Sequence, residues 1–307
     1  MFAVTYRRNF FIAIALIALG SIAALVIIRP SLSIEFTGGS LVEVAYQDVR
    51  PSHEELVAKV GTLNYGNPSV RESGANGVTV RTRTLTPEEH VALLAALSDA
   101  NTRPLTELRF NSIGPSIGNE LAIKALYAIA AVILAIVLYI AWAFRHVSRP
   151  VSSWVYGLIV VAILVHDLLI PAGFFAIYSF FTGAQIDTLF VVALLAILGY
   201  SVNDTIVIFD RVREHLRTNE ERNVRETFEV TVGKSITETL GRSINTSVTV
   251  ILALIALAVF GSKETIEFAL VLLAGVVAGT YSSILLAAPL LVPLSERFAT
   301  KTSPKKK

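Results

Sequence analysis

Six apolar runs divide the chain, and each is long enough to form a helix across a membrane hydrocarbon layer of about 30 Å. One run lies near the N-terminus, and the other five follow a long polar segment. The runs are Phe10–Ile28, Leu121–Phe144, Val151–Phe180, Ile186–Phe209, Ile244–Phe260 and Ile266–Val292. This pattern predicts a polytopic α-helical membrane protein with six transmembrane helices.

The first run has two interpretations. Arg7 and Arg8 precede it, as basic residues precede the apolar region of a signal peptide. However, the run is long and ends Val-Ile-Ile-Arg-Pro instead of in the small residues of a cleavage site. We therefore expect a retained anchor.

Basic residues mark one side of the six predicted spans, which the positive-inside rule assigns to the cytoplasm together with both termini. They are Arg7, Arg8, Arg145, Arg149, the segment 211–234, Lys301 and Lys305 to Lys307. The predicted organisation is 1–29, the N-terminus and first span; 30–119, an external domain; 120–295, five spans with a cytoplasmic segment 211–239; and 296–307, a basic tail. We expect the charged segment 211–234 to form a cytoplasmic helix near the membrane.

The segment between the first two spans alternates between strand-like and helix-like patterns. Strand patterns are followed by a helix, a hairpin around Gly74–Gly77, a second helix that begins at Pro87, and a last strand. The strands are expected at Ser33–Phe36, Leu41–Tyr46, Ser69–Glu72, Val78–Thr82 and Leu105–Phe110, the first helix at His53–Val60, and the face of the second at Val91, Leu94, Ala95 and Leu97. This order predicts a small ferredoxin-like α+β domain with its helices on one face of a sheet.

Composition limits the chemistry that this chain can perform. It is 53% hydrophobic and 16% charged, with a mean hydropathy of +0.63, which is too apolar for one water-soluble core. It has no cysteine, which excludes disulfides, thiol nucleophiles and cysteine metal sites. The net charge of +2 and the clustering of basic residues in loops give no case for nucleic acid. We expect no metal and no cofactor, because His53 and His90 lie beside glutamates at predicted helix starts, where acidic residues are ordinary.

Ionisable residues within a spanning helix cost about 2.5–3.5 kcal/mol on insertion scales and therefore call for a reason. His166 and Asp167 lie near the middle of the third predicted span. Histidine titrates near neutral pH, so this pair could relay protons, or it could form a buried hydrogen-bonded pair that fixes packing. Both interpretations remain open from the sequence.

The fourth predicted span carries Ser201, Asn203 and Asp204, with Tyr200 one turn before the aspartate. Asp204 lies about 10 Å from the midpoint of the span toward the cytoplasm. Because burial disfavours a charged carboxylate unless a cation is close, Asp204 is a candidate reversible proton carrier. The alternative is a water-accessible cap at the end of the helix, which fits less well because four apolar residues follow.

The fifth predicted span begins with Arg242, and Asn245, Thr246 and Thr249 follow along one face. Alone, Arg242 would be read as an anchor that reaches toward the membrane surface. The polar stripe favours a face that points into the bundle, with Asp204 as the partner of Arg242. In the sixth span, Gly275 and Gly279 recur with Ser283 every four residues, a seam that permits close helix packing within the bundle or against another subunit.

Several motifs resemble the SecF proteins of the SecD/SecF family over nearly the whole chain. The fourth-span segment from Gly199 to Glu214 is similar to the signature of the family almost residue for residue. Further similar segments are Glu35-Phe36-Thr37-Gly38-Gly39-Ser40, Ile113-Gly114-Pro115-Ser116-Ile117-Gly118, His166-Asp167, Arg242-Ser243-Ile244-Asn245-Thr246-Ser247 and Gly279-Thr280-Tyr281-Ser282-Ser283. Glu35 stands where the family has Asp, and Ser40 where it has Thr.

The resemblance implies a half-bundle of the resistance-nodulation-division (RND) transporter type in the bacterial cytoplasmic (inner) membrane, with a periplasmic domain that interacts with unfolded preprotein. It implies SecD as a partner, which we expect as a separate polypeptide, with the SecYEG channel, YajC and YidC as further partners. Protons are the implied coupling ion. Asp204 is then the proton-handling carboxylate and Arg242 its essential partner.

From the resemblance and the intramembrane carboxylate, we expect protonation of Asp204 to weaken its pairing with Arg242 and let the external domain swing on Pro30 and Gly114–Pro115. Three competing functions are a small-molecule exporter of the same superfamily, an intramembrane hydrolase that uses His166 and Asp167, and a purely structural subunit. A single small external module argues against the exporter. No nucleophile or second ligand pair at helical spacing supports the hydrolase.

Overall fold

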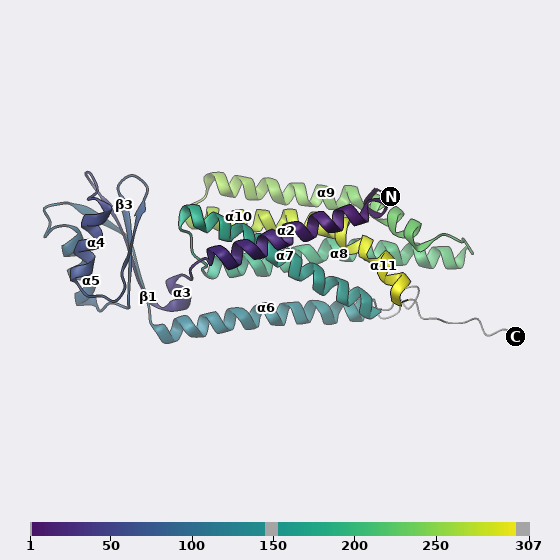
Figure 1. Cartoon of the computed structure of the whole chain (residues 1–307), viewed down its shortest axis with the longest axis horizontal. Coiled ribbons are helices and arrows are strands. Elements are labelled where there is room, and N and C mark those ends of the chain that lie inside the picture. The colour runs from purple at the N-terminus through teal and green to yellow at the C-terminus, as the bar shows by residue number, and fades with distance from the viewer. Residues whose placement is uncertain (1, 145–152, 299–307) are drawn as a thin grey trace. The chain divides into compact units, whose positions relative to one another are not determined.

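The computed structural model describes residues 2–144 and 153–298, and these form two compact units. One unit contains residues 31–126 together with 185–188, and the other contains the remaining parts of the chain (Figure 1). Among the basic residues used to predict orientation, Arg145, Arg149, Lys301 and Lys305 to Lys307 lie outside the described residues. The predicted basic tail 296–307 also lies largely outside them.

In the described part of the chain, six helical segments have the length and apolar composition to cross a membrane. They are α2 (Arg7–Ile28), α6 (Pro115–Ala143), α7 (Ser153–Thr182), α8 (Thr188–Glu221), α9 (Phe228–Phe260) and a last span made of α10 (Lys263–Ser282), a π-helical turn (Ser283–Ala287) and α11 (Ala288–Phe298). A short helix, α1 (Phe2–Thr5), precedes α2. The prediction of a six-span membrane protein is confirmed.

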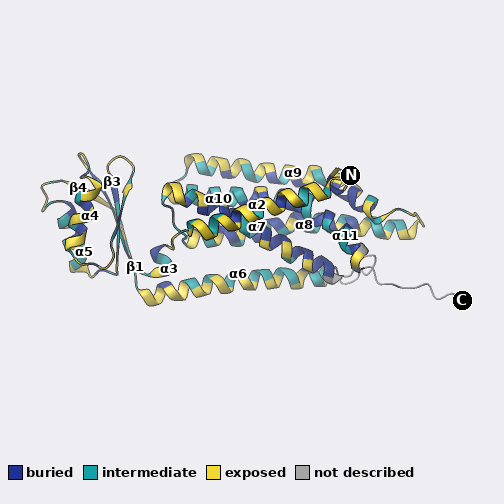
Figure 2. Ribbon diagram, viewed as in Figure 1, coloured by how far each residue is buried: buried dark blue, intermediate teal, exposed yellow. Residues whose placement is uncertain are grey.

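The core of the membrane unit is built mainly from α7, α8 and the last span. An aromatic cluster joins three elements: Tyr156 of α7 stacks on Phe144, which follows α6, and both rings contact Phe209 of α8 at centroid distances of 5.1 and 6.1 Å. Figure 2 shows that α6 carries mostly exposed and half-buried residues along its length, with Gly118 and Ile140 buried. Exposed apolar side chains on a membrane-length helix are suited to lipid or to a partner helix.

The last span is interrupted by the π-helical turn. The sequence predicted one continuous helix over Ile266–Val292, whereas the hydrogen-bond register changes at Ser283–Ala287. The π-helix occurs mostly as such single turns within α-helices, frequently at functional sites. Here the turn follows directly after Ser282, whose hydroxyl donates to the buried carboxylate of Asp167.

The other unit contains a four-stranded antiparallel sheet in the order β2-β3-β1-β4. Its elements are β1 (Gly39–Tyr46), α4 (His53–Thr62), β2 (Ser69–Ser73), β3 (Gly77–Thr82), α5 (Pro87–Leu97) and β4 (Leu105–Ile113). Val42, Val44, Val78 and Val80 of the central strands are fully buried with Leu56 and Leu93 of the two helices. This β-α-β-β-α-β arrangement confirms the predicted ferredoxin-like domain.

Two local predictions are wrong, the second only in part. Ser33–Phe36 does not form a strand: α3 (Ile34–Thr37) is a short helix, because the Ser33 hydroxyl caps it by accepting the Glu35 N–H. On α5, Leu97 is buried and Leu94 packs against the core as predicted, but Leu93 joins them there, whereas Ala95 is exposed and Val91 is 65% exposed. His90 occupies the neighbouring inner position, where its ring stacks on Phe110 of β4.

The charged segment 211–234 is not a separate helix. Its first part continues α8 to Glu221, and its last part belongs to α9, which begins at Phe228 after a cap in which Thr227 accepts the Val230 N–H. The two extensions pair because Val212 and Val232 are both buried in the core of the membrane unit. The segment is therefore a hairpin of two helix ends.

Candidate functional site

Asp167 of α7 is completely buried and saturated with hydrogen-bond donors. The hydroxyls of Ser201 in α8 and Ser282 in α10 both donate to its Oδ2 atom, the second at 2.9 Å. Its Oδ1 atom lies 2.7 Å from Nδ1 of the neighbouring His166. A single carboxylate therefore connects three spans. The donors offset the cost of removing the carboxylate from water.

The second nitrogen of His166 extends this cluster. Nε2 lies 3.2 Å from the Tyr281 hydroxyl, and the two rings meet edge to face. His166 is 7% exposed, and both of its nitrogens have protein partners. The chain Tyr281–His166–Asp167–Ser201 is a continuous set of groups that can pass or hold a proton.

A layer of hydroxyls joins α8, α9 and α10 beside this cluster. The Tyr200 hydroxyl donates to Ser247 Oγ at 2.8 Å, and Ser247 Oγ lies 2.7 Å from Thr280 Oγ1. Ser247 also donates to the Ser243 carbonyl of its own helix. The three helices are thus connected by short polar side chains, which permit close approach in a membrane.

Asp204 differs from Asp167 although both are buried. It is 4% exposed, and its Oδ2 atom has no hydrogen-bond partner among the described residues. Two side chains of α9 interact with it, the Ser243 hydroxyl and the Arg242 guanidinium, but Ser243 Oγ also lacks a partner with standard hydrogen-bond geometry among those residues. A buried, unsatisfied carboxylate oxygen is unusual in a folded protein and marks a site built for more than stability.

The polar stripe of α9 lies on the outside of the described bundle. Arg242, Asn245 and Thr249 are exposed, whereas Ser243 and Ser247 face inward. In the described residues, no ion pair within 4 Å joins Arg242 to Asp204. The expectation that the stripe faces the interior is wrong for this chain alone, because the serine face of α9 packs inward. Asn203 of α8 is exposed in the same way.

The seam of small residues on α10 packs against α8. A Cβ atom on Gly275 would lie 2.2 Å from Cδ1 of Ile197, and one on Gly279 would lie 3.1 Å from Cβ of Ser201. Only a hydrogen at these positions allows the two helices to approach this closely. The approach carries Ser282 of α10 to Asp167 and thereby helps to build the cluster.

Of the predicted hinge residues, Pro30 lies at a boundary between the two units, whereas Gly114 and Pro115 lie within the unit that extends to Leu126. Pro30 is the last residue of the first membrane segment, and Arg29 before it has a left-handed backbone, with φ of 51°. Gly114 lies between β4 and α6, and a Cβ atom there would meet nothing within 4 Å. Pro115 begins α6, as proline often begins a helix.

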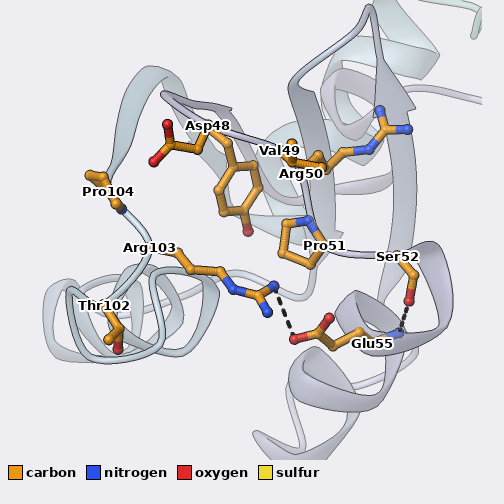
Figure 3. Close-up of a pocket in the computed structure, with 10 residues that line it drawn as sticks. Asp48, Val49, Arg50, Pro51, Ser52, Glu55, Thr102, Arg103 and Pro104 are labelled. Atoms are coloured by element: carbon orange, nitrogen blue, oxygen red, sulfur yellow. Dashed lines mark hydrogen bonds and ion pairs between the residues drawn. The ribbon is translucent and has the colours of Figure 1, made fainter.

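A depression of 410 Å³ lies on the external domain between the start of α4 and the loop before β4 (Figure 3). Two of its charged groups pair with each other, Arg103 with Glu55 at 3.1 Å, and Glu55 also pairs with Lys59 beside the depression. The hydrogen bond from Lys59, together with Arg103, lowers the pKa of Glu55. These contacts stabilise the surface of the domain, and no acid–base pair converges on the depression.

Sequence reasoning did not assign Ser243, Ser247, Tyr281 or Ser282 to the site. Serine and tyrosine are common in packed membrane helices, so their spacing alone did not separate them from packing residues. A useful signal was the adjacent pair Tyr281 and Ser282 in an apolar run. Within residues 2–144 and 153–298, no three His, Asp or Glu side chains gather in a way that could hold a metal ion.

Comparisons with known proteins identify the family of this chain. The family model described as protein export membrane protein SecD/SecF, C-terminal, matches residues 93–297. The protein translocase subunit SecF of Anaerolinea thermophila is 38% identical over 93% of this chain and 92% of that protein. The protein translocase subunit SecDF of Bacillus subtilis is 29% identical over 97% of this chain, which spans 38% of that protein.

A solved structure gives the same result for the fold. The crystal structure of SecDF, a translocon-associated membrane protein from Thermus thermophilus, superposes with a TM-score of 0.80 and 28% identity. The match covers 96% of this chain and 38% of the SecDF chain. From the family match, the relatives and the shared fold, this chain belongs to the SecD/SecF family of protein export membrane proteins.

Proposed function

We propose that this chain is a SecF-type accessory subunit of the Sec protein translocase, which acts with SecD to drive late preprotein translocation and release by using the proton gradient. The observation that carries the proton role is Asp204, a buried carboxylate with an oxygen that no described residue satisfies. Uptake of a proton would remove its charge at little cost in hydrogen bonds. The subunit is not an enzyme in this proposal.

The exposed polar face of α8 and α9 supports a partner inside the membrane. Arg242, Asn245, Thr249 and Asn203 would be costly against lipid, because hydrocarbon cannot hydrogen-bond them. The relatives named SecDF are longer single chains of which this chain matches one part. We therefore assign the face to SecD, and propose SecYEG, YajC and YidC as further members of the assembly.

In this mechanism, protonation of Asp204 weakens its attraction to Arg242 and shifts α8 relative to α9. Motion at Pro30 and Gly114–Pro115 then moves the external domain, which holds the emerging unfolded preprotein. The proposal places the chain in the bacterial cytoplasmic membrane, with both termini in the cytoplasm. Ser201 lies on the same face of α8 as Asp204. Through Ser201, the cluster of His166 and Asp167 would deliver the proton to Asp204 or receive it.

The test is proton-gradient-dependent translocation into membrane vesicles that contain SecD and either wild-type chain or Asp204→Asn. We expect the variant to insert normally and to lose the stimulation by the gradient. Asp210→Asn is the matched control, because Asp210 lies on the same helix, is exposed and pairs with Arg213. Stimulation of Asp204→Asn to the wild-type level would show that the proton role is wrong.

A further inference from the structure

The segment that follows α2 binds the loop that leads into α8. The Ser33 N–H donates to the Ile186 carbonyl at 2.8 Å, and the Ile186 N–H donates to the Ser31 carbonyl at 3.0 Å. These bonds form a parallel bridge between Leu32 and Ile186. The side chain of Gln185 adds a bond to the Ser31 hydroxyl at 3.1 Å. The two segments are far apart in sequence but joined by backbone pairing.

Glu35 strengthens this attachment at the first residue of α8. Its Oε2 atom accepts the Thr188 N–H at 2.7 Å and the Thr188 hydroxyl at 2.5 Å. The first N–H groups of a helix have no partner within the helix, and a carboxylate is favoured at its positive end. Glu35 therefore caps α8 from 153 residues away in the sequence.

The same segment is also packed against the start of α6. Gly38 has φ of +72°, and a Cβ atom there would lie 2.6 Å from Cα of Pro115. On the facing side, a Cβ atom on Gly118 would lie 2.6 Å from the backbone nitrogen of Gly38. Backbone meets backbone at this contact, so residues 31–38 are held at the starts of both α6 and α8.

This attachment has a mechanical consequence. Residues 185–188 belong to the compact unit that contains the external domain, whereas α8 from Leu189 onward belongs to the membrane unit. Asp204 lies further along the same helix, about 24 Å from Thr188 at 1.5 Å per residue. The helix that carries the proposed proton site therefore begins inside the external unit, and Glu35 holds that beginning in place.

We propose that Glu35 is a positioning residue that couples Asp204 to the external domain by keeping the start of α8 attached to residues 31–38 throughout the transport cycle. A shift of α8 caused by proton uptake is then transmitted to the domain at Thr188. The proposal rests on the proposed function of Asp204 as the proton carrier. The contact between Glu35 and Thr188 lies beyond Pro30 in the chain. It therefore gives the external domain a fixed connection to α8, in addition to the hinge residues.

The first experiment separates proton movement from translocation. In vesicles with SecD, we expect Glu35→Ala to lower gradient-driven translocation about tenfold, as fits loss of a charge-assisted hydrogen bond, while proton uptake changes less than about twofold. Thr188→Val, which removes only the hydroxyl donor, should show a smaller loss of the same kind. Glu54→Ala, at an exposed carboxylate in the first turn of α4, is the matched control and should match wild type.

The second experiment replaces the carboxylate contact with a covalent bond. The chain has no cysteine, so Leu32→Cys with Ile186→Cys adds the only thiols. Bridge partners lie about 4.8 Å apart, within the range of about 4.4–6.8 Å that a disulfide spans. We expect the oxidised pair to remain active and to restore translocation to Glu35→Ala, and reductant to reverse the rescue.

Two outcomes would overturn the coupling role. One is an equal loss of proton uptake and translocation in Glu35→Ala, which would indicate a structural cap alone. The other is inactivation of otherwise wild-type chain by the oxidised pair, which would mean that the contact must open. Asp204→Asn is measured in parallel: if it translocates normally, the proposed function fails, whereas if only Glu35→Ala is normal, the coupling alone fails.

Discussion

The external domain and the membrane helices hold their carboxylates in two different ways. In the external domain, Glu55 and Asp99 pair with Lys59 at 2.7 and 2.6 Å, and Glu89 pairs with Arg83 at 2.5 Å. The hydrogen bond from Lys59 lowers the pKa of both Glu55 and Asp99. These groups stay charged under ordinary conditions, because each has a cation beside it and water around it.

In the membrane helices, neither buried aspartate has a lysine or arginine within ion-pair distance in the described chain. Asp167 is surrounded by hydroxyls and an imidazole that donate to it, whereas Asp204 keeps an unsatisfied oxygen. The difference separates a carboxylate that assembles helices from one that can change its charge without breaking many bonds. Substitutions at the two aspartates and at the helix seam beside them test whether the two carboxylates have these different roles.

The largest stability effect is expected for Asp167→Ala. It removes the acceptor of three donors in a dry environment, and we expect a loss of about 2–4 kcal/mol in the free energy of unfolding, since intramembrane hydrogen bonds contribute up to about 1.7 kcal/mol each. Asp204→Ala should change that free energy by less than about 1 kcal/mol, because few native hydrogen bonds are lost. Reversible unfolding in mixed micelles measures both variants.

Asp210→Ala serves as the control for this pair, because Asp210 is exposed on the same helix as Asp204. A destabilisation by Asp204→Ala as large as that by Asp167→Ala would contradict the division. It would mean that Asp204 has structural partners that outweigh its open oxygen. Unchanged stability in Asp167→Ala would show that the three donors find other acceptors.

A smaller effect is expected at the seam between α8 and α10. In Gly275→Ala, the new methyl group would lie 2.2 Å from Cδ1 of Ile197, so α10 must move away from α8. We expect a loss of about 1–3 kcal/mol, as is typical of overpacking, measured by the same unfolding assay. Gly279→Ala should cost less, because its nearest neighbour is at 3.1 Å.

The seam variant also distinguishes the two aspartates. Movement of α10 pulls Ser282 from Asp167, whereas the α9 groups that interact with Asp204 are not on α10. Adding Ile197→Ala to Gly275→Ala should restore much of the stability, because it makes room for the methyl group. If the double variant is no more stable than the single one, the close approach of α8 and α10 is not the cause.

The regular parts of this fold were predictable from sequence for a physical reason. Long uninterrupted apolar runs have one stable form in a bilayer, so all six spans were found, and strand alternation with turn glycines located β1 to β4. Ser33–Phe36 was misread, because a four-residue alternation also fits a capped helical turn. Cap geometry and the pairing of Leu32 with Ile186 decided between them.

The site was predictable only in part. The cost of burying an ionisable group points to Asp167, Asp204 and Arg242 from the sequence alone. Helical periodicity shows which residues share a face, but not which neighbouring helix packs on that face. The sequence therefore led us to expect Arg242 and Asn245 on the inward face of α9, whereas Ser243 and Ser247 occupy that face in the structure. The contact of Glu35 with Thr188 joins segments that no local pattern connects.

The smallest effect is expected for acid titration of the external domain. Hydrogen bonds from the Arg83 side chain and the Thr86 N–H lower the pKa of Glu89 from 4.5 to about 2. Because the folded pKa lies below the unfolded value, this contact stabilises α5 above about pH 4.5 and is lost as the pH falls toward 2. The rate of hydrogen exchange of α5 amides in the full chain, corrected for intrinsic rates, should rise as the pH falls over that range.

Glu89→Gln should abolish this acid dependence with only a slight change near neutral pH, because surface ion pairs contribute little to stability. Glu54→Gln, at an exposed position in the first turn of α4, should keep the wild-type profile. A wild-type profile in Glu89→Gln would mean that other carboxylates govern the acid response. If the profile is lost as expected, this pair cannot account for a response of translocation to protons near neutral pH, which leaves the membrane aspartates as the groups to test.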